Sequence, residues 1–220
     1  MSVEKKRIVV KVGSSTITYQ NGKANIRKIE RLARVMSDLH NSGHEMVLVS
    51  SGAIAVGVGR LELNVKPEST RMKQAAAAVG QCDLMFMYDK LFGEYNTPVA
   101  QILLTRDIVE DENRKENTEN TFAALIEMGV IPIVNENDTV STEEIFFGDN
   151  DHLSAIVAEL CSADLLIMVT DTDGLYDKDP RIDSSAKLIS HVEHITPEMR
   201  ECAGGSGTLR GTGGMHTKVL

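Results

Sequence analysis

Two lysines lie beside small residues in the arrangement that phosphate-binding sites use. Lys11 precedes Gly13 and two serines, and Lys218 follows the glycine-rich stretch 211–214. Glycine permits close backbone approach, so that consecutive N–H groups can converge on phosphate oxygens, while lysine adds a mobile positive charge. The pattern therefore predicts a phosphate site. The alternative is that Lys11 is an ordinary strand-end lysine that reaches solvent.

The stretch 211–218 (GTGGMHTK) matches neither of the two commonest nucleotide motifs. A Walker A motif needs Gly-Lys-Ser/Thr, and dinucleotide-binding folds need the spacing G-x-G-x-x-G. An ordinary flexible loop remains an alternative for this stretch, because glycine and threonine also cluster in loops for local reasons. The small residues 50–52 (SSG) are a weaker signal for phosphate binding, because small residues after a strand often make only a tight turn.

Two clusters rich in Asp and Asn, 135–138 (NEND) and 148–151 (GDND), offer a different chemistry. Asx residues at a helix start usually cap it, and Asp149 or Asn150 could do only that. Two neighbouring clusters exceed what capping requires, however. Together they supply acceptors for an ammonium group and amide donors for a carboxylate. The clusters therefore favour an amino-acid ligand.

Other polar segments are less specific. Residues 170–176 (TDTDGLY), followed by Asp179-Pro180, form a strand exit and a turn that could line a base and a ribose, although a surface turn explains them equally well. The histidine spacings predict no metal site, and Cys82, Cys161 and Cys202 fit neither a disulfide framework nor a zinc motif.

Hydrophobic periodicity predicts an α/β fold. Short apolar runs indicate strands and longer periodic stretches indicate helices. The strands are expected at 7–12, 46–49, 99–104, 130–134 and 165–169, the helices at 26–39, 72–92, 117–128 and 152–161, and a small hairpin at 140–147. This alternation indicates a mainly parallel sheet covered on both faces, which binds ligands at the carboxyl ends of its strands. The cluster 135–138 is expected to follow the fourth strand.

Composition limits the class of protein. The chain has 220 residues with 42% hydrophobic and 25% charged content, which suits a single globular domain. A net charge of −9 disfavours nucleic acid or an anionic membrane as a partner. No apolar run suits a membrane span or a signal peptide, so a cytoplasmic location is expected.

Six segments, taken in order, resemble the amino acid kinase family. The resemblance covers residues 7–218, and the segments are VVKVGSS, VSSGAIAVG, IPIVNENDTVS, FGDNDHLSA, VTDTDGLYDKDPR and GTGGMHTK. The resemblance implies a three-layer α/β/α sandwich. The NEND, FGDND and GTGGM-x-TK segments resemble most the members that phosphorylate the γ-carboxylate of L-glutamate with ATP. Those members make γ-glutamyl phosphate, the first step of proline biosynthesis.

The resemblance also implies roles for individual residues. Glutamate would be bound by Ser51, Asp138 and Asn150. The catalytic residues would be Lys11, Asp151 and Lys218, with Asp151 holding the two lysines in place. Gly13 and Gly52 would offer backbone amides to the transferred phosphoryl group. ATP, carrying Mg²⁺ on its phosphates, would be bound by Lys11, Thr170, Asp171, Thr212, Gly213, Gly214, Met215, His216, Thr217 and Lys218. No metal ligand on the protein is implied.

Physical chemistry agrees with these roles. The side-chain carboxylate of glutamate, with an ordinary pKa of about 4.3, is ionised at neutral pH, so its attack needs no general base. The obstacle is repulsion of about 4 kcal/mol per charge pair at about 4 Å and an effective dielectric near 20. Lysines and Mg²⁺ around the phosphoryl group would offset that repulsion.

The resemblance has limits and rivals. Members of the family continue beyond the point equivalent to Leu220, and many that act on glutamate add a PUA domain, so residues 1–220 are expected to be one kinase domain without its C-terminal end and without a PUA domain. Family members form dimers or tetramers and are inhibited by proline. The alternatives are a family member that uses acetylglutamate or a nucleotide, and a non-catalytic amino-acid sensor on the same scaffold.

Overall fold

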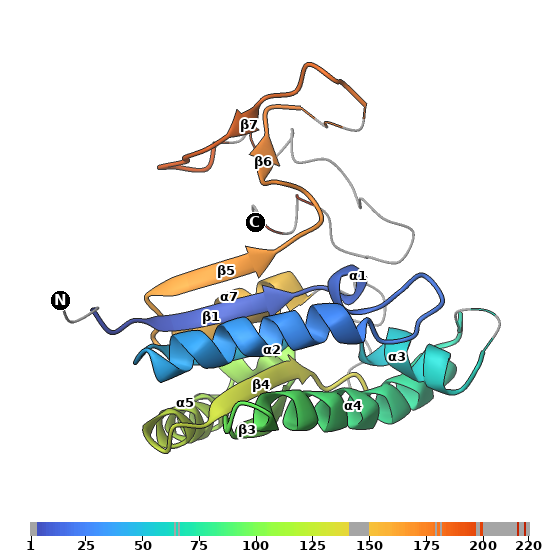
Figure 1. Cartoon of the computed structure of the whole chain (residues 1–220), viewed down its shortest axis with the longest axis vertical. Coiled ribbons are helices and arrows are strands. Elements are labelled where there is room, and N and C mark those ends of the chain that lie inside the picture. The colour runs from blue at the N-terminus through green and yellow to red at the C-terminus, as the bar shows by residue number, and fades with distance from the viewer. Residues whose placement is uncertain are drawn as a thin grey trace.

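A central sheet of five parallel strands organises the chain. The computed structural model describes residues 4–63, 65, 67–140, 150–178, 180, 182–196, 199, 215 and 218. The strand order is β3-β4-β2-β1-β5, and every pairing is parallel, which confirms the predicted sheet (Figure 1). The strands are β1 (Arg7–Val12), β2 (Glu45–Ser50), β3 (Val99–Leu104), β4 (Ile131–Glu136) and β5 (Leu165–Val169).

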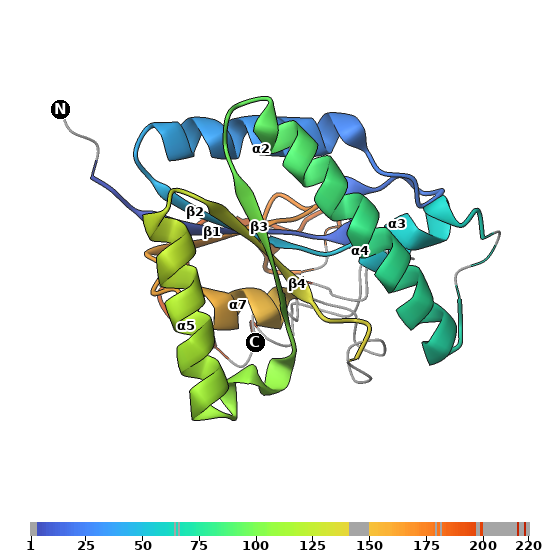
Figure 2. The same cartoon turned by 90° about the horizontal axis from the view of Figure 1, so that it is seen from below.

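Helices cover both faces of the sheet and make three layers, as expected from the family resemblance. One face carries α2 (Ile26–Asn41) and α4 (Thr70–Gly93), and the other carries α5 (Glu112–Glu127) and α7 (Asn150–Leu160) (Figure 2). Because side chains alternate along a strand, each strand contributes to both cores. In β1, Val10 packs in the core under α2 and α4, whereas Val9 packs in the core under α5 and α7.

Most strands and helices begin and end within two residues of the predicted ranges, but α5 begins at Glu112, five residues before the predicted start, and β4 ends two residues later than predicted. It extends through Asn135 and Glu136, because these residues continue the ladder to Leu103 and Leu104 of β3. The expectation that the whole cluster 135–138 follows the strand was therefore wrong. All but the first residue of the hairpin expected at 140–147 lies outside the described residues.

Periodicity did not reveal the shortest elements. They are α1 (Ser14–Ile17), α3 (Ala53–Arg60), the 3-10 helix η1 (Arg106–Val109), and the antiparallel pair β6 (Leu175–Tyr176) and β7 (Leu188–Ile189). The first two matter most, because α1 begins two residues after β1 and α3 begins three residues after β2. Both helices therefore start at the strand ends where ligands of parallel sheets bind.

Two glycines let α3 cross α4 at close range. A Cβ atom at Gly57 would lie 1.8 Å from the Ala76 carbonyl oxygen, and one at Gly80 would lie 1.8 Å from the Ala53 carbonyl oxygen. No side chain fits either position without movement of the backbone. Since Ala53 opens α3, this crossing determines where the loop between β2 and α3 lies.

Among the helices that the structure describes, none combines the length and the apolar character needed to cross a membrane.

Candidate active site

Lys11 is a buried cation at the carboxyl end of β1. It lies two residues after Val9, so its side chain points to the same face of the sheet, the one covered by α5 and α7. It is only 3% exposed, and its Nζ donates a hydrogen bond to Oδ1 of Asp151 in α7. The alternative of a solvated strand-end lysine is therefore wrong.

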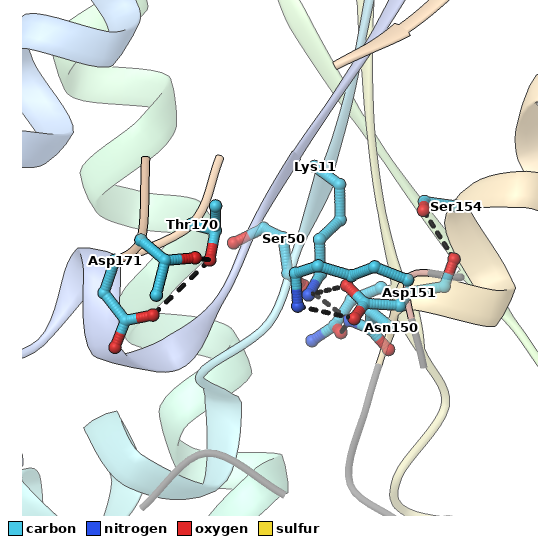
Figure 3. A network of polar contacts seen from close by, with 10 residues as sticks. Lys11, Ser50, Asn150, Asp151, Ser154, Thr170 and Asp171 are labelled. Atoms are coloured by element: carbon cyan, nitrogen blue, oxygen red, sulfur yellow. Dashed lines mark hydrogen bonds and ion pairs between the residues drawn. The ribbon is translucent and has the colours of Figure 1, made fainter. Parts of the chain in front are cut away.

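Asp151 joins Lys11 to Lys218. Its side chain is fully buried in the first turn of α7, where the partial positive charge of the helix N-terminus favours a carboxylate. Lys218 Nζ donates to Asp151 Oδ2 at 2.8 Å, while Oδ1 accepts from Lys11. The structure thus brings together the three residues for which the family resemblance implied catalytic roles, with two lysines on one aspartate. Figure 3 shows the contact between Lys11 and Asp151.

Asn150 precedes Asp151 and is held by two hydrogen bonds. Its Nδ2 donates to the Ser50 carbonyl oxygen at 3.1 Å and to Asn135 Oδ1 at 2.7 Å. Asn135 Nδ2 in turn donates to Gln81 Oε1 of α4 at 2.8 Å. These contacts connect the ends of β2 and β4 to the start of α7.

Tyr88 of α4 contacts the end of β2. Its hydroxyl lies 2.7 Å from Ser50 Oγ, and burial raises the pKa of the Tyr88 phenol to about 12, although the hydrogen bond with Ser50 opposes the shift. Sequence reasoning assigned no role to Gln81, Tyr88 or Ser50. For Gln81 and Tyr88, the only signal in the sequence is their spacing of seven residues, which places both on one side of a helix.

Gly13 and Gly52 occupy the turns after β1 and β2. A Cβ atom at Gly13 would lie 3.9 Å from Lys11 Nζ, so this backbone lies beside the buried ammonium group. Gly52 has a φ of +105°, and a Cβ atom there would come within 2.9 Å of Ile17 Cδ1. Glycine is therefore needed at Gly52 for both conformation and space.

The remaining described residues of the predicted site lie along the same edge of the sheet. Ser51 is buried directly after β2, and Asp138 is partly buried in the turn after β4. Thr170 follows β5, and its hydroxyl donates to Asp171 Oδ1 at 3.4 Å. Since β1 lies between β2 and β5, Lys11 separates the Thr170 side of the site from the Ser51 side.

Of the predicted nucleotide loop 212–218, the structure describes only Met215 and Lys218. Met215 is half-buried and Lys218 contacts Asp151, whereas Thr212, Gly213, Gly214, His216 and Thr217 lie outside the described residues. Within the described part of the chain, no group of three or more His, Cys, Asp or Glu side chains is arranged to hold a metal ion.

Comparison with known proteins defines the class. The family model described as "Amino acid kinase family" matches residues 6–220, and the chain belongs to this family. Among its relatives is a glutamate 5-kinase from Clostridium perfringens, which is 60% identical over 98% of this chain and 82% of its own length. A glutamate 5-kinase from Listeria innocua is 54% identical over 97% of this chain and 79% of its own length.

A solved structure confirms the fold independently. The UMP kinase from Ureaplasma parvum superposes with a TM-score of 0.59 at 17% sequence identity, over 86% of this chain and 77% of that chain. At this identity the likeness concerns the fold alone.

Proposed function

We propose that this chain is a glutamate 5-kinase that transfers the γ-phosphoryl group of ATP to the γ-carboxylate of L-glutamate and so forms γ-glutamyl phosphate. The observation that carries the proposal is the pair of lysines held by Asp151 at the carboxyl end of β1. The relatives named glutamate 5-kinase, at 60% and 54% identity over almost the whole chain, support glutamate as the acceptor. The product would enter proline biosynthesis.

The reaction needs charge neutralisation more than proton transfer. A carboxylate oxygen of glutamate attacks the γ-phosphorus, and the bond from that phosphorus to the oxygen bridging it to the β-phosphate breaks. The electron pair leaves with ADP. No proton moves, because the attacking carboxylate is already ionised at neutral pH. Lys11 and Lys218 would stabilise the negative charge of the phosphoryl group during transfer, and Asp151 would keep both ammonium groups in place.

The order of the strands suggests where each substrate binds. Thr170 and Asp171, after β5, would contact ATP, together with the loop from Thr212 to Lys218. Ser51, Asp138 and Asn150, near the ends of β2 and β4, would contact glutamate. Lys11, on β1 between them, would meet the phosphoryl group that passes from ATP to glutamate. Gly13 and Gly52 would add backbone N–H donors.

Magnesium would come with ATP. The groups around Lys11 fit phosphate oxygens, since two ammonium groups and glycine turns converge there. Mg²⁺ bound to the ATP phosphates would supply further neutralisation of their charge. Lys11 and Lys218 would hold the phosphate end of that complex.

The test is ATP consumption by the full chain with Mg²⁺ and hydroxylamine, which traps an acyl phosphate as a hydroxamate. Glutamate, acetylglutamate, aspartate and uridine monophosphate are compared as acceptors. We expect hydroxamate with glutamate. Turnover with another acceptor instead would overturn the substrate assignment, and binding of glutamate without turnover would favour the sensor.

Variants test the catalytic assignment. Lys11→Met and Lys218→Met each remove a positive charge from the phosphoryl group, and we expect each to lower kcat by about a hundredfold or more. Lys28 is exposed on α2, so Lys28→Met is the matched control, and we expect its kcat to be normal. If both site variants kept near-normal turnover, the two lysines would have to be withdrawn from the mechanism.

We also propose, from family membership alone, that the chain assembles into dimers or tetramers and binds proline as a feedback inhibitor. The cytoplasmic location and the extent of the kinase domain stay predictions.

A further inference from the structure

Three side-chain amides connect α4 to the start of α7. Gln81 Oε1 accepts from Asn135 Nδ2 at 2.8 Å, and Asn135 Oδ1 accepts from Asn150 Nδ2 at 2.7 Å. Asn135 and Asn150 are only 3% and 5% exposed. Buried amides with few alternative partners hold one another in place. We call these three residues the amide relay.

Two backbone groups determine which way the asparagine amides of the relay face. The Glu136 N–H donates to Asn135 at 2.9 Å, so the atom of Asn135 at that position must be its oxygen. The Ser50 carbonyl oxygen accepts from Asn150 at 3.1 Å, so the atom of Asn150 there must be its nitrogen. Because a backbone N–H only donates and a carbonyl only accepts, these orientations do not depend on an arbitrary choice between nitrogen and oxygen.

The orientation leaves one specific atom of Asn150 for a ligand. Nδ2 uses both of its hydrogens, on Ser50 and on Asn135. Oδ1 accepts no hydrogen bond from the residues that the structure describes, and it is not among their fully buried atoms that lack a partner. Asn150 therefore offers an acceptor, which suits an ammonium group and does not suit a carboxylate.

We propose that Gln81 is a positioning residue that, through Asn135, holds Asn150 with its oxygen directed to the ammonium group of the amino-acid substrate. The inference rests on the proposed function, since it takes glutamate as the acceptor. Gln81 acts through Asn135 and does not itself contact the reacting atoms. The hydrogen bonds of the relay join α4, β4 and α7 to one another and to the end of β2, and none of these bonds involves Lys11 or Lys218. Gln81 should therefore affect the binding of the substrate and not the transfer of the phosphoryl group.

Loss of the acceptor at Gln81 should weaken the binding of the substrate through Asn135 and Asn150. Asn135 Nδ2 would become a buried donor without its partner, which is costly, and the side chain would turn to find another. Asn135 Oδ1 would then leave Asn150 Nδ2, and Asn150 would lose one of its two restraints. The ammonium group of glutamate would meet an acceptor that is no longer held in place.

The experiment compares Gln81→Met, which keeps the length of the side chain and its helix propensity, with Gln81→Glu, which keeps an oxygen acceptor. We expect Gln81→Met to raise the KM for glutamate about tenfold, with the KM for ATP and kcat changed by about twofold or less. Gln81→Glu should restore the KM for glutamate, because its carboxylate accepts from Asn135 Nδ2. Gln20→Met, at an exposed position, is the matched control.

Each other outcome decides against the inference. An unchanged KM for glutamate in Gln81→Met, an equal rise in the KM for both substrates, or a Gln81→Glu variant as poor as Gln81→Met would leave Gln81 with a structural role only. If the unaltered chain phosphorylates no acceptor, the proposed function fails separately. Calorimetric titration with glutamate then decides: weaker binding by Gln81→Met supports the relay, and equal or absent binding by both proteins rejects it.

Discussion

The buried charges of Lys11 and Asp151 show how a single contact can be costly for the fold and useful for the reaction. Removing two charges from water costs several kcal/mol per ion, and their mutual attraction offsets this only with good geometry. Here both Asp151 oxygens carry a lysine partner, at 2.8 Å in the case of Lys218. The fold therefore keeps two ammonium groups together that would otherwise repel each other.

Tyr88 gives a prediction at the residue scale that depends on pH. Tyr88→Phe removes the hydrogen bond to Ser50 and should lower the free energy of unfolding by about 1 kcal/mol near neutral pH. The pKa of Tyr88 is about 12 in the folded chain, against an ordinary value of 10.0 for an exposed tyrosine. Between these values the unfolded chain releases the proton while the folded chain keeps it, so this residue's contribution to stability falls as pH rises.

The measurement is urea unfolding of both proteins at about pH 8 and about pH 11. The stability difference between the unaltered chain and Tyr88→Phe should shrink at the higher pH, because the variant has no phenol to titrate. A difference that stays constant would mean that burial does not perturb this phenol.

At the scale of elements, the crossing of α3 and α4 controls the loop after β2. We expect Gly80→Ala to lower the free energy of unfolding by about 1–3 kcal/mol, because its Cβ would meet the Ala53 carbonyl oxygen at 1.8 Å. Displacement of Ala53 would also shift Ser51 and Gly52, so turnover should fall as well. Chemical denaturation and the hydroxamate assay measure the two effects.

Gly93→Ala is the matched control in the same helix. A Cβ atom at Gly93 has nothing within 4 Å, so this change should be neutral or stabilising by up to about 1 kcal/mol. Equal effects of the two substitutions would show that helix propensity, and not the crossing, determines the cost.

At the scale of the whole molecule, the strand order β4-β2-β1-β5 should separate the two substrates. We expect Asp138→Ala, after β4, to raise the KM for glutamate about tenfold, and Asp171→Ala, after β5, to raise the KM for ATP by a similar factor. Steady-state kinetics with each substrate varied in turn measures both constants. Substitutions at well-separated positions act additively within about 0.5 kcal/mol, and β2 and β1 lie between β4 and β5, so the double variant should show the two effects combined. The reverse assignment of KM effects would contradict the proposed division of the site.

Much of this architecture follows from local patterns. The strands at Arg7–Val12, Val99–Leu104 and Leu165–Val169 match the predicted ranges, because short β-branched runs between turn residues have few other ways to bury their side chains. The small residues beside Lys11 also predicted a phosphate site at a strand end; Lys11 does lie near the end of β1, and the phosphate site stays a prediction.

Helix α3 shows where local patterns fail. Its segment is only eight residues long and rich in small side chains, so its periodicity is weak, and its position depends on contact with Gly80 of α4. Likewise, β4 includes Asn135 and Glu136 because β3 pairs with them, and residue type alone favours a loop there.

The sequence by itself determined the alternation of strands and helices, the residue types at the strand exits, and the resemblance that suggested Lys11, Asp151 and Lys218. The resemblance already implied that Asp151 holds Lys11, 140 residues away, but only the tertiary structure decided that this contact is buried and that Gln81 holds Asn135, 54 residues away. The physical reason is the range of the interactions. Periodicity depends on neighbours a few residues apart, whereas these contacts exist only after helices have packed on both faces of the sheet.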